Sequence, residues 1–350
     1  MDSLPDALVQ HILSHINNAK DVAVCNCVSK RWKDSLPYIR SLYFARNSFD
    51  NLSGLENPDN IVWKMISTIV RLEELVVYSP FSGVGLASWL SLVGPSLRHL
   101  ELRMDNLVEH QICNESPSKL DCISAAKNLE SLKLWGRLDD PALSAALGGC
   151  PNLTNLLLLG CEGVRLVSIE LPHLQQCKLD FYGLGNCQLS ITSPKIELLE
   201  VQGCSWIRVH ETNCLKNLSI ANNAGKVYRV DFGKLEALEF LSIRGVQWCW
   251  DAVSNMLKWA SDVKHLYMKP KHVDSGFVIP SLEELVITVR SPLNAEQKMS
   301  TVESLLKYGR NLKSMVIKIL QMKSNHSSAD DFFDEICRFR CMNRKIVRIE

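Results

Sequence analysis

The sequence predicts an α/β protein in which three short N-terminal helices precede a curved solenoid of about 11 to 12 stacked repeats, with a parallel sheet on its concave face. Three observations lead to this prediction. An apolar motif recurs at regular intervals through most of the chain. The first forty residues lack that motif and space their apolar residues as helices do. The composition, 46% hydrophobic and 22% charged residues, is typical of a folded globular protein.

The recurring motif is L-x-x-L-x-L, with Ile, Val, Met or Cys also allowed at its apolar positions. Neighbouring copies mostly begin 19 to 25 residues apart, and the longest interval is 32 residues. This spacing is typical of leucine-rich repeats, whose period is roughly 20–29 residues. The eleven copies begin at Leu72, Leu97, Leu129, Leu153, Leu174, Ile196, Leu215, Leu238, Val263, Leu282 and Leu312, and a degenerate copy begins at Ile39.

The motif has a simple physical reading. Its last two apolar positions, for example Leu132 and Leu134, are two residues apart, so on a strand both point to the same face. One repeat cannot bury this apolar row alone. Stacked repeats share a continuous core and pair their strands into one parallel sheet. The sequence therefore predicts one strand for each copy.

Features between the copies support the same fold. Gly136, Gly160, Gly203 and Gly245 each lie seven residues after the first apolar residue of a copy, where glycine lets the chain turn off the strand. The convex segments are short and varied. We expect helices over residues 141–147 and 250–260, whereas residues 187–193 are too short and too β-rich for a full helix.

The N-terminus reads as three short helices. The first is expected from the helical spacing of Leu8, Val9, Ile12, Leu13 and Ile16. Asp21 is the expected N-cap of the second helix, and Ser29 to Trp32 lead into a third segment that Pro37 closes. So few residues bury little surface alone, so the module is expected to pack on a neighbour or a partner.

These residues resemble the F-box motif in type and order. The resemblance is carried by Leu4-Pro5, Ile12-Leu13, Asp21-Val22 and Val28-Ser29-Lys30-Arg31-Trp32. Ser29 stands where a cysteine is common, which is a small-for-small change. Together with the repeats, the chain resembles plant-type F-box/leucine-rich-repeat proteins. We therefore expect an F-box over residues 1–40, the repeat solenoid over 41–325, and a C-terminal cap of one helix and one strand over 326–350.

The resemblance implies a function. In that family the F-box binds the adaptor subunit of an SCF (Skp–cullin–F-box) ubiquitin ligase, and through it the cullin, while the repeats select the protein to be ubiquitinated. A face of apolar helical residues would dock into the helices of the adaptor. By position, the adaptor-binding residues would be Leu4, Pro5, Leu8, Ile12, Leu13, Val28 and Trp32. The plainer alternative is that these helices only cap the solenoid.

Residues between the inward leucines point out from the concave sheet, and two clusters of them are candidates for binding the unidentified target protein. Trp135, Leu157 and Leu159 would form an apolar patch on two neighbouring strands. An aromatic and basic patch would be formed by Phe240, Arg244, His265 and Tyr267. Such side chains often dominate the energy of interfaces. The alternative is that a loop or the C-terminal tail covers them.

The composition argues against several other functions. The formal net charge of +1 gives no global attraction to nucleic acid or to an anionic membrane. No apolar run approaches the ~20 residues that span a bilayer, and the start of the chain does not resemble a secretory signal. The 13 cysteines are mostly scattered singly, which is typical of small buried side chains in a reducing compartment. We expect the protein in the nucleus, the cytoplasm or both.

No motif for catalysis, phosphate binding or dinucleotide binding occurs, and the cysteines and histidines lack metal-site spacing. We therefore expect a non-catalytic subunit with no cofactor and no metal. Two alternatives stay open: an F-box receptor that senses a small molecule, and a repeat scaffold that has lost ligase assembly. A pull-down of the adaptor separates the scaffold from the ligase subunit.

Overall fold

The structure is a computed structural model that describes residues 4–49, 57–104, 120–182, 187–248, 250–268, 279–289, 295–320 and 327–350. The chain divides into two compact units, residues 1–182 and 183–350, which we call the N-terminal unit and the C-terminal unit. Each unit holds one run of the repeats. The domain boundaries expected at residues 40 and 325 stay a prediction.

Three helices and a single helical turn open the N-terminal unit: α1 (Asp6–Ser14), α2 (Ala19–Cys25), α3 (Lys30–Ser35) and η1 (Leu36–Tyr38). The three predicted helices are confirmed, but Asp21 as the N-cap of α2 is wrong. The cap is Asn18, whose side-chain oxygen accepts a hydrogen bond from the Lys20 N–H at 3.0 Å. The helix begins earlier than predicted because Ala19 is already buried in its first turn. Ser29 caps α3 by accepting from the Trp32 N–H at 3.3 Å.

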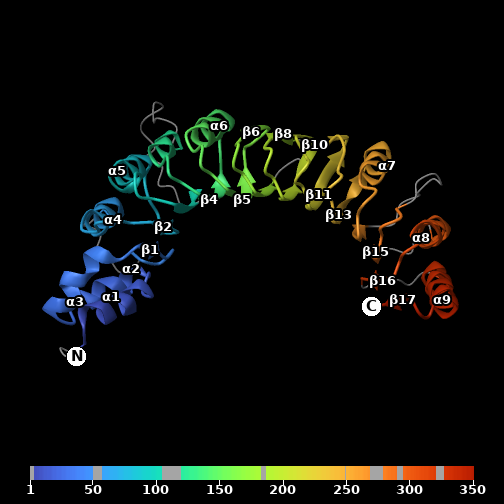
Figure 1. Cartoon of the computed structure of the whole chain (residues 1–350), viewed down its shortest axis with the longest axis horizontal. Coiled ribbons are helices and arrows are strands. Elements are labelled where there is room, and N and C mark those ends of the chain that lie inside the picture. Colours follow the sequence, from blue (N-terminus) through green and yellow to red (C-terminus); the bar gives the residue numbers. More distant parts are fainter. Residues whose placement is uncertain are drawn as a thin grey trace. The chain divides into compact units, whose positions relative to one another are not determined.

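A parallel sheet makes up the rest of the N-terminal unit, and each strand pairs with the next copy of the motif. Its strands are β1 (Ser41–Phe44), β2 (Glu74–Val77), β3 (His99–Arg103), β4 (Ser131–Arg137), β5 (Asn155–Glu162) and β7 (Gln176–Phe181). Figure 1 shows α4 (Pro58–Ser67), α5 (Gly83–Val93) and α6 (Asp140–Gly148) on one side of these strands. The short strand β6 (Leu166–Glu170) and the turn η3 (Asp121–Ala125) complete the unit. We call the opposite side of the sheet the open face.

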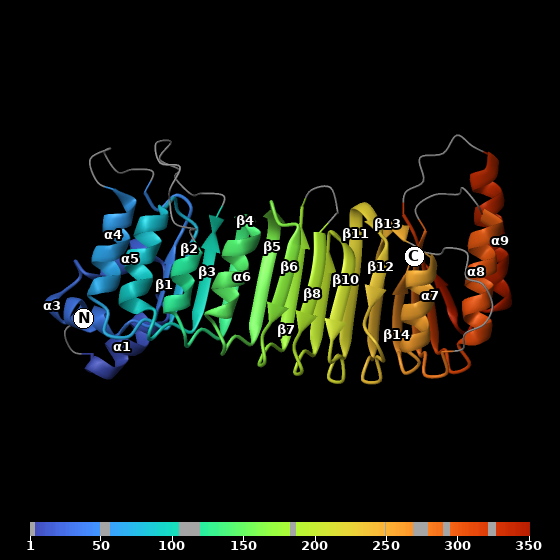
Figure 2. The ribbon, with the colours of Figure 1, turned by 90° about the horizontal axis from the view of Figure 1, so that it is seen from above.

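The C-terminal unit repeats this arrangement with seven parallel strands. They are β9 (Leu198–Gln202), β11 (Asn217–Val227), β13 (Phe240–Trp248), β14 (His265–Met268), β15 (Glu284–Val289), β16 (Ser314–Ile319) and β17 (Val347–Ile349). A second parallel sheet lies in front of the first of these strands in the view of Figure 2. It consists of β8 (Cys187–Thr192), β10 (Cys204–His210) and β12 (Arg229–Asp231). Helices connect the later strands: α7 (Trp250–Trp259) lies between β13 and β14, α8 (Ala295–Tyr308) between β15 and β16, and α9 (Ser327–Met342) between β16 and β17.

The register of the strands explains how the apolar positions of the motif form a continuous core. Leu75 pairs with Leu100, which pairs with Leu132, so the central apolar positions of successive copies stand in one row. In the C-terminal unit Leu241 and Leu266 continue the same rule. All apolar positions of the twelve copies are buried. The structure therefore confirms the α/β class, the N-terminal helices and the parallel repeat sheet.

The segments between the strands also follow the sequence. α6 and α7 occupy the two predicted helical segments, and β8 confirms that residues 187–193 do not form a helix. The four glycines of the repeat turns all have positive φ angles. Near the C-terminus Phe332, Ile336 and Phe339 are the buried side of α9, and β17 pairs with β16 as one more strand of the sheet.

Candidate functional site

Helix α1 exposes an apolar face beside its buried face. Val9 and Leu13 are 0% and 1% exposed and belong to the core, whereas Leu8 and Ile12 are 47% and 38% exposed. Leu8 and Ile12 are four residues apart, so they lie one above the other on the helix surface. Pro5, at the N-cap of the same helix, is exposed as well. Two of the predicted adaptor residues therefore form an uncovered apolar row.

Further apolar side chains are exposed in and just after α2. Val28, a predicted adaptor residue, is 45% exposed, and Val24 is 65% exposed. The neighbours of Val24, Val22 and Cys25, fill the buried side of α2. We call Pro5, Leu8, Ile12, Val24 and Val28 the N-terminal apolar set. Leu8 and Ile12 are the adjacent pair within this set, and adjacent exposed apolar side chains are typical of a surface that a partner covers.

The remaining predicted adaptor residues lie deeper. Leu13 is in the core and can only support the surface from inside, while Leu4 and Trp32 are half-buried. The indole N–H of Trp32 has no acceptor among the described residues. Arg31 joins α3 to the start of α1, because its Nε donates to the Asp6 carboxylate at 2.5 Å. Packing and this ion pair hold α1 against α3.

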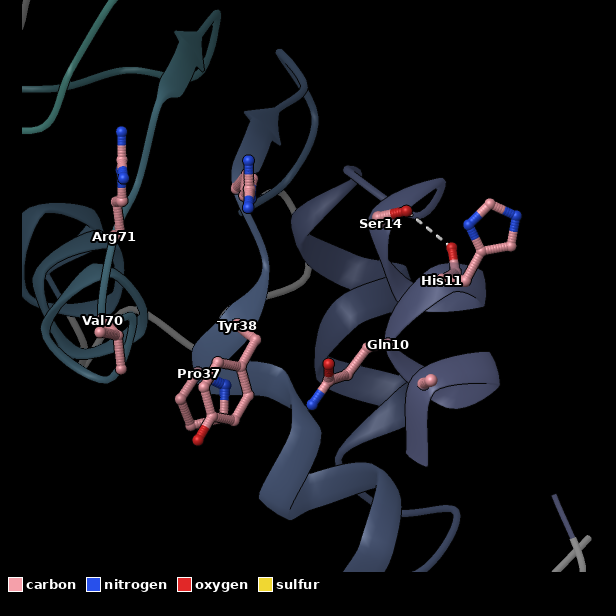
Figure 3. A pocket seen from close by; sticks show the side chains of 9 residues that line it. Gln10, His11, Ser14, Pro37, Tyr38, Val70 and Arg71 are labelled. Carbon is pink, nitrogen blue, oxygen red and sulfur yellow. Dashed lines mark hydrogen bonds between the residues drawn. The ribbon is translucent and has the colours of Figure 1, made fainter. Parts of the chain in front are cut away.

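A cavity of about 630 Å³ lies on another side of α1 (Figure 3). Gln10, His11 and Ser14 line it from the helix, and Tyr38 and Arg71 line it from η1 and from the segment before β2. At about 100° per residue, these helix positions and the row of Leu8 and Ile12 fall on different faces of α1. The sequence reasoning did not single out this cavity. Its walls mix polar and cationic side chains with Ala7, Pro37 and Val70. Because it lies on another face of α1, it does not extend the N-terminal apolar set.

The open face of the N-terminal unit carries a row of aromatic and apolar side chains. Trp135 on β4 stands directly opposite Leu159 on β5, and Leu157 is on the same strand, so the structure brings the first predicted patch together. Two tyrosines lengthen it: the ring of Tyr78 meets Trp135 edge-on at 5.5 Å between centroids, and Tyr43 meets Tyr78 in the same way at 5.4 Å. We call these five residues the aromatic row.

Charged neighbours hold the aromatic row in place. The Tyr78 hydroxyl donates to Glu101, and the Lys133 ammonium lies 3.1 Å from the same carboxylate. Lys133 also sits over the Trp135 ring, 4.2 Å from its centroid, in a cation–π contact. Burial and the Glu101 carboxylate raise the pKa of Tyr78 above its usual value, so this hydroxyl stays protonated as a donor. The rings are therefore positioned before any partner arrives.

The second predicted patch lies around a cavity of about 400 Å³ on the open face of the C-terminal unit. Phe240, Arg244 and Tyr267 line the cavity, and the rings of Phe240 and Tyr267 are 5.1 Å apart. Ser219 and Ser242 line it too, and we call these five residues the hollow. Sequence reasoning missed both serines because small side chains give no local signal of a binding site.

His265, the remaining residue of that patch, turns to another partner. It pairs across the sheet with Phe240 by register, but its Nδ1 lies 3.0 Å from the Glu284 carboxylate. It does not line the hollow's cavity. The pKa of Tyr267 is raised by partial burial and by the Glu284 carboxylate, which keeps its hydroxyl neutral.

Nothing in the described residues suggests a metal centre, because no three His, Cys, Asp or Glu side chains gather there. The cysteines that the structure describes are all free thiols. Within the described ranges no helix has the length and apolar character that a membrane span requires.

Stacked repeats with an open sheet face, preceded by helices that leave apolar side chains uncovered, define a repeat protein with an N-terminal helical module. Comparison with known proteins makes this specific. Residues 1–44 match the F-box-like family. The chain is 54% identical to the F-box protein At1g10780 of Arabidopsis thaliana, with both chains covered in full. It is also 21% identical to the F-box/LRR-repeat protein At1g67190 of that plant, over 76% of this chain and 70% of the relative. The chain belongs to the F-box protein family.

Proposed function

We propose that this chain is the substrate-recognition subunit of an SCF ubiquitin ligase. The observation that carries the proposal is the F-box-like match at residues 1–44, where the N-terminal apolar set is left uncovered. F-box domains typically bind Skp1-like adaptors. An adaptor that covers Leu8 and Ile12 would remove their apolar surface from water, which is the main driving force of such association.

The repeats would hold the target protein. On the open face of each unit, the aromatic row and the hollow are places where half-exposed aromatic side chains gather beside charged ones. Aromatic anchors in positioned surroundings supply much of the binding energy of protein interfaces. Trp135, Leu157 and Leu159, and Phe240, Arg244, His265 and Tyr267, thus remain our candidates for contact with a target.

The chain would act without a reactive group of its own. By holding adaptor and target together it would raise the effective concentration of target lysines near the ubiquitin-carrying enzyme, which is catalysis by proximity. A subunit of this kind needs no cofactor. We expect it in the nucleus or the cytoplasm, where free buried thiols such as Cys177 are stable.

The test is adaptor binding by purified variants. Replacing Leu8 and Ile12 together by Ala should weaken binding of a recombinant Skp1-like adaptor by roughly 100-fold, because about 3 kcal/mol of apolar burial is lost. Isothermal titration calorimetry measures the change. Leu92→Ala is the matched control: this side chain on α5 is 46% exposed, close to the 47% of Leu8, and its loss should leave the affinity unchanged.

Two results would overturn the ligase proposal. Wild-type protein that binds no adaptor would leave the chain as a repeat scaffold. Equal loss of affinity in the Leu8/Ile12 and Leu92 variants would show that the effect comes from general destabilisation.

A further inference from the structure

The hollow on the C-terminal unit owes its depth to two small side chains. In one register row across the sheet, Glu200 on β9 is followed by Ser219, Ser242 and Tyr267 on the next three strands. The strands of a sheet lie about 4.8 Å apart, so the outer two residues stand roughly 14 Å from each other. Ser219 and Ser242 form a low, hydroxyl-bearing floor between them. The hollow thus forms because the strand register places two serines between larger side chains.

A cation is held over this floor. Arg244 lies two residues beyond Ser242 on β13, and its Nη2 donates to Ser219 Oγ at 3.1 Å, so the guanidinium folds back across the row of serines. The backbone carbonyl of Arg244 accepts a hydrogen bond from the Trp248 indole at 3.1 Å, which fixes this part of the strand. A positioned guanidinium binds a carboxylate through two parallel hydrogen bonds.

An apolar wall stands beside the cation. Phe240 and Tyr267 are half-exposed and their rings are tilted by 37° at 5.1 Å between centroids. Tyr267 is the register neighbour of Ser242, so the wall begins one strand away from the floor that the guanidinium crosses. The cation and the apolar wall therefore line one cavity, from strands about 4.8 Å apart.

The charges around the hollow select among anions. Arg244 is the cation that lines it, and Glu200 faces it from the opposite wall. A run of acidic residues would be repelled by Glu200, whereas near Tyr267 the Glu284 carboxylate is opposed by Lys318. A single carboxylate on an otherwise uncharged segment fits better. The last residue of a chain supplies this combination, because one Cα bears both the carboxylate and a side chain.

We propose that the hollow captures the free C-terminus of a target protein whose last residue is apolar. The terminal carboxylate binds Arg244, and the last side chain packs on Phe240 and Tyr267. The serine hydroxyls and the Glu200 carboxylate provide hydrogen-bond partners for the preceding backbone. The proposal rests on the proposed function, since it names the feature by which the ligase subunit would recognise its target.

The probe is a library of random decapeptides displayed with free C-termini and selected on the full-length protein. The selected peptides should end in an apolar residue. Binding of a selected peptide, measured by fluorescence anisotropy, should fall at least tenfold when its C-terminus is amidated. It should fall equally on Arg244→Gln, and less on Arg244→Lys, which keeps the charge but loses the two-pronged donor.

Controls separate recognition from folding. Lys216→Gln removes another cation of the C-terminal unit, one that pairs with Glu197 outside the hollow, and should leave peptide binding unchanged. Arg244 is exposed, so Arg244→Gln should keep the thermal midpoint of the wild type. A Phe240→Ala variant should lose binding of the same peptides.

Several outcomes would overturn the proposal: no enrichment of peptides, equal binding of free and amidated peptides, or loss of binding with Lys216→Gln instead of Arg244→Gln. Adaptor binding is measured on the same preparations. A protein that binds the adaptor but no C-terminal peptide refutes the hollow alone. A protein that binds such peptides but no adaptor refutes the ligase proposal and leaves the hollow standing.

Discussion

Single positions decide whether a repeat turn can form. Gly245 has a φ angle of 125°, and a Cβ added there would lie 2.3 Å from the backbone oxygen of Asn222. Both strain and clash oppose any side chain. We predict that Gly245→Ala lowers the stability of the protein by about 2–4 kcal/mol, seen as a lower urea midpoint.

Gly148 provides the matched control. It ends α6 and a Cβ added there meets nothing within 4 Å. Because alanine favours the helix over glycine, Gly148→Ala should leave the midpoint unchanged or raise it by up to about 1 kcal/mol. A Gly245 variant as stable as wild type would show that the turn tolerates another conformation.

The buried thiols should be chemically silent. Burial raises the pKa of Cys150 to about 11, and the pKa of Cys177 is raised further by the same cause. At pH 8 iodoacetamide should label the exposed Cys27 and Cys214 at least tenfold faster than Cys150 or Cys177. Mass spectrometry of timed samples reports the rates. Labelling of Cys177 as fast as Cys214 in the folded protein would contradict the packing described.

The raised pKa of Cys150 makes the free energy of unfolding depend on pH. Below a pH of about 9 the Cys150 thiol is protonated in both the folded and the unfolded chain, so its contribution to stability is fully present. Between about pH 9 and 11 the unfolded chain loses this proton while the folded one keeps it. The free energy of unfolding should therefore fall as the pH rises through this range.

The conformation or role of a residue could be predicted where its neighbours in the sequence determine it. The positive φ of the four turn glycines follows from their place in the motif. The choice between Asn18 and Asp21 as N-cap does not, since both residue types suit that position and the burial of Ala19 decides it. Tyr78 could have been found, because it follows the last apolar residue of its copy as Trp135 does in the next copy but one.

At the scale of elements, the aromatic row is a test of target binding. Trp135→Ala removes the ring that meets both Tyr78 and Lys133, and should weaken binding of a verified target by roughly 30-fold, or about 2 kcal/mol. Surface plasmon resonance with that target measures the change. Leu166→Ala is the control, since this side chain on β6 is 59% exposed and lies outside the aromatic row. An unchanged affinity in the Trp135 variant would exclude the row as the binding site.

Elements were predictable where a motif repeats. Each copy predicts its own strand because burial on one face demands two apolar positions two residues apart. The second sheet of β8, β10 and β12 was beyond this reasoning, since those segments alternate without a shared motif. The hollow was only half predictable. Its aromatic and basic residues stand out in the sequence, but its floor exists because Ser219 and Ser242 come into register.

At the scale of the whole molecule, we propose that one part of the chain meets the ligase and another part meets the target. Variants of the two parts should have opposite effects on the amount of target bound to the chain. Loss of Leu8 and Ile12 leaves target binding intact but stops delivery, so the target should accumulate on the variant. Substitutions in the target-binding surface should release the target from the chain.

The most direct test is quantitative mass spectrometry of the proteins that co-purify from cells with wild-type chain and with the Leu8→Ala/Ile12→Ala variant, each with and without proteasome inhibition. We predict a set of proteins enriched on the variant without inhibitor, and recovered on the wild type, in ubiquitinated form, when the proteasome is blocked. Leu92→Ala should behave as the wild type does. The same proteins in the same amounts on both chains, whatever the state of the proteasome, would contradict the claim that this protein delivers targets to a ubiquitin ligase.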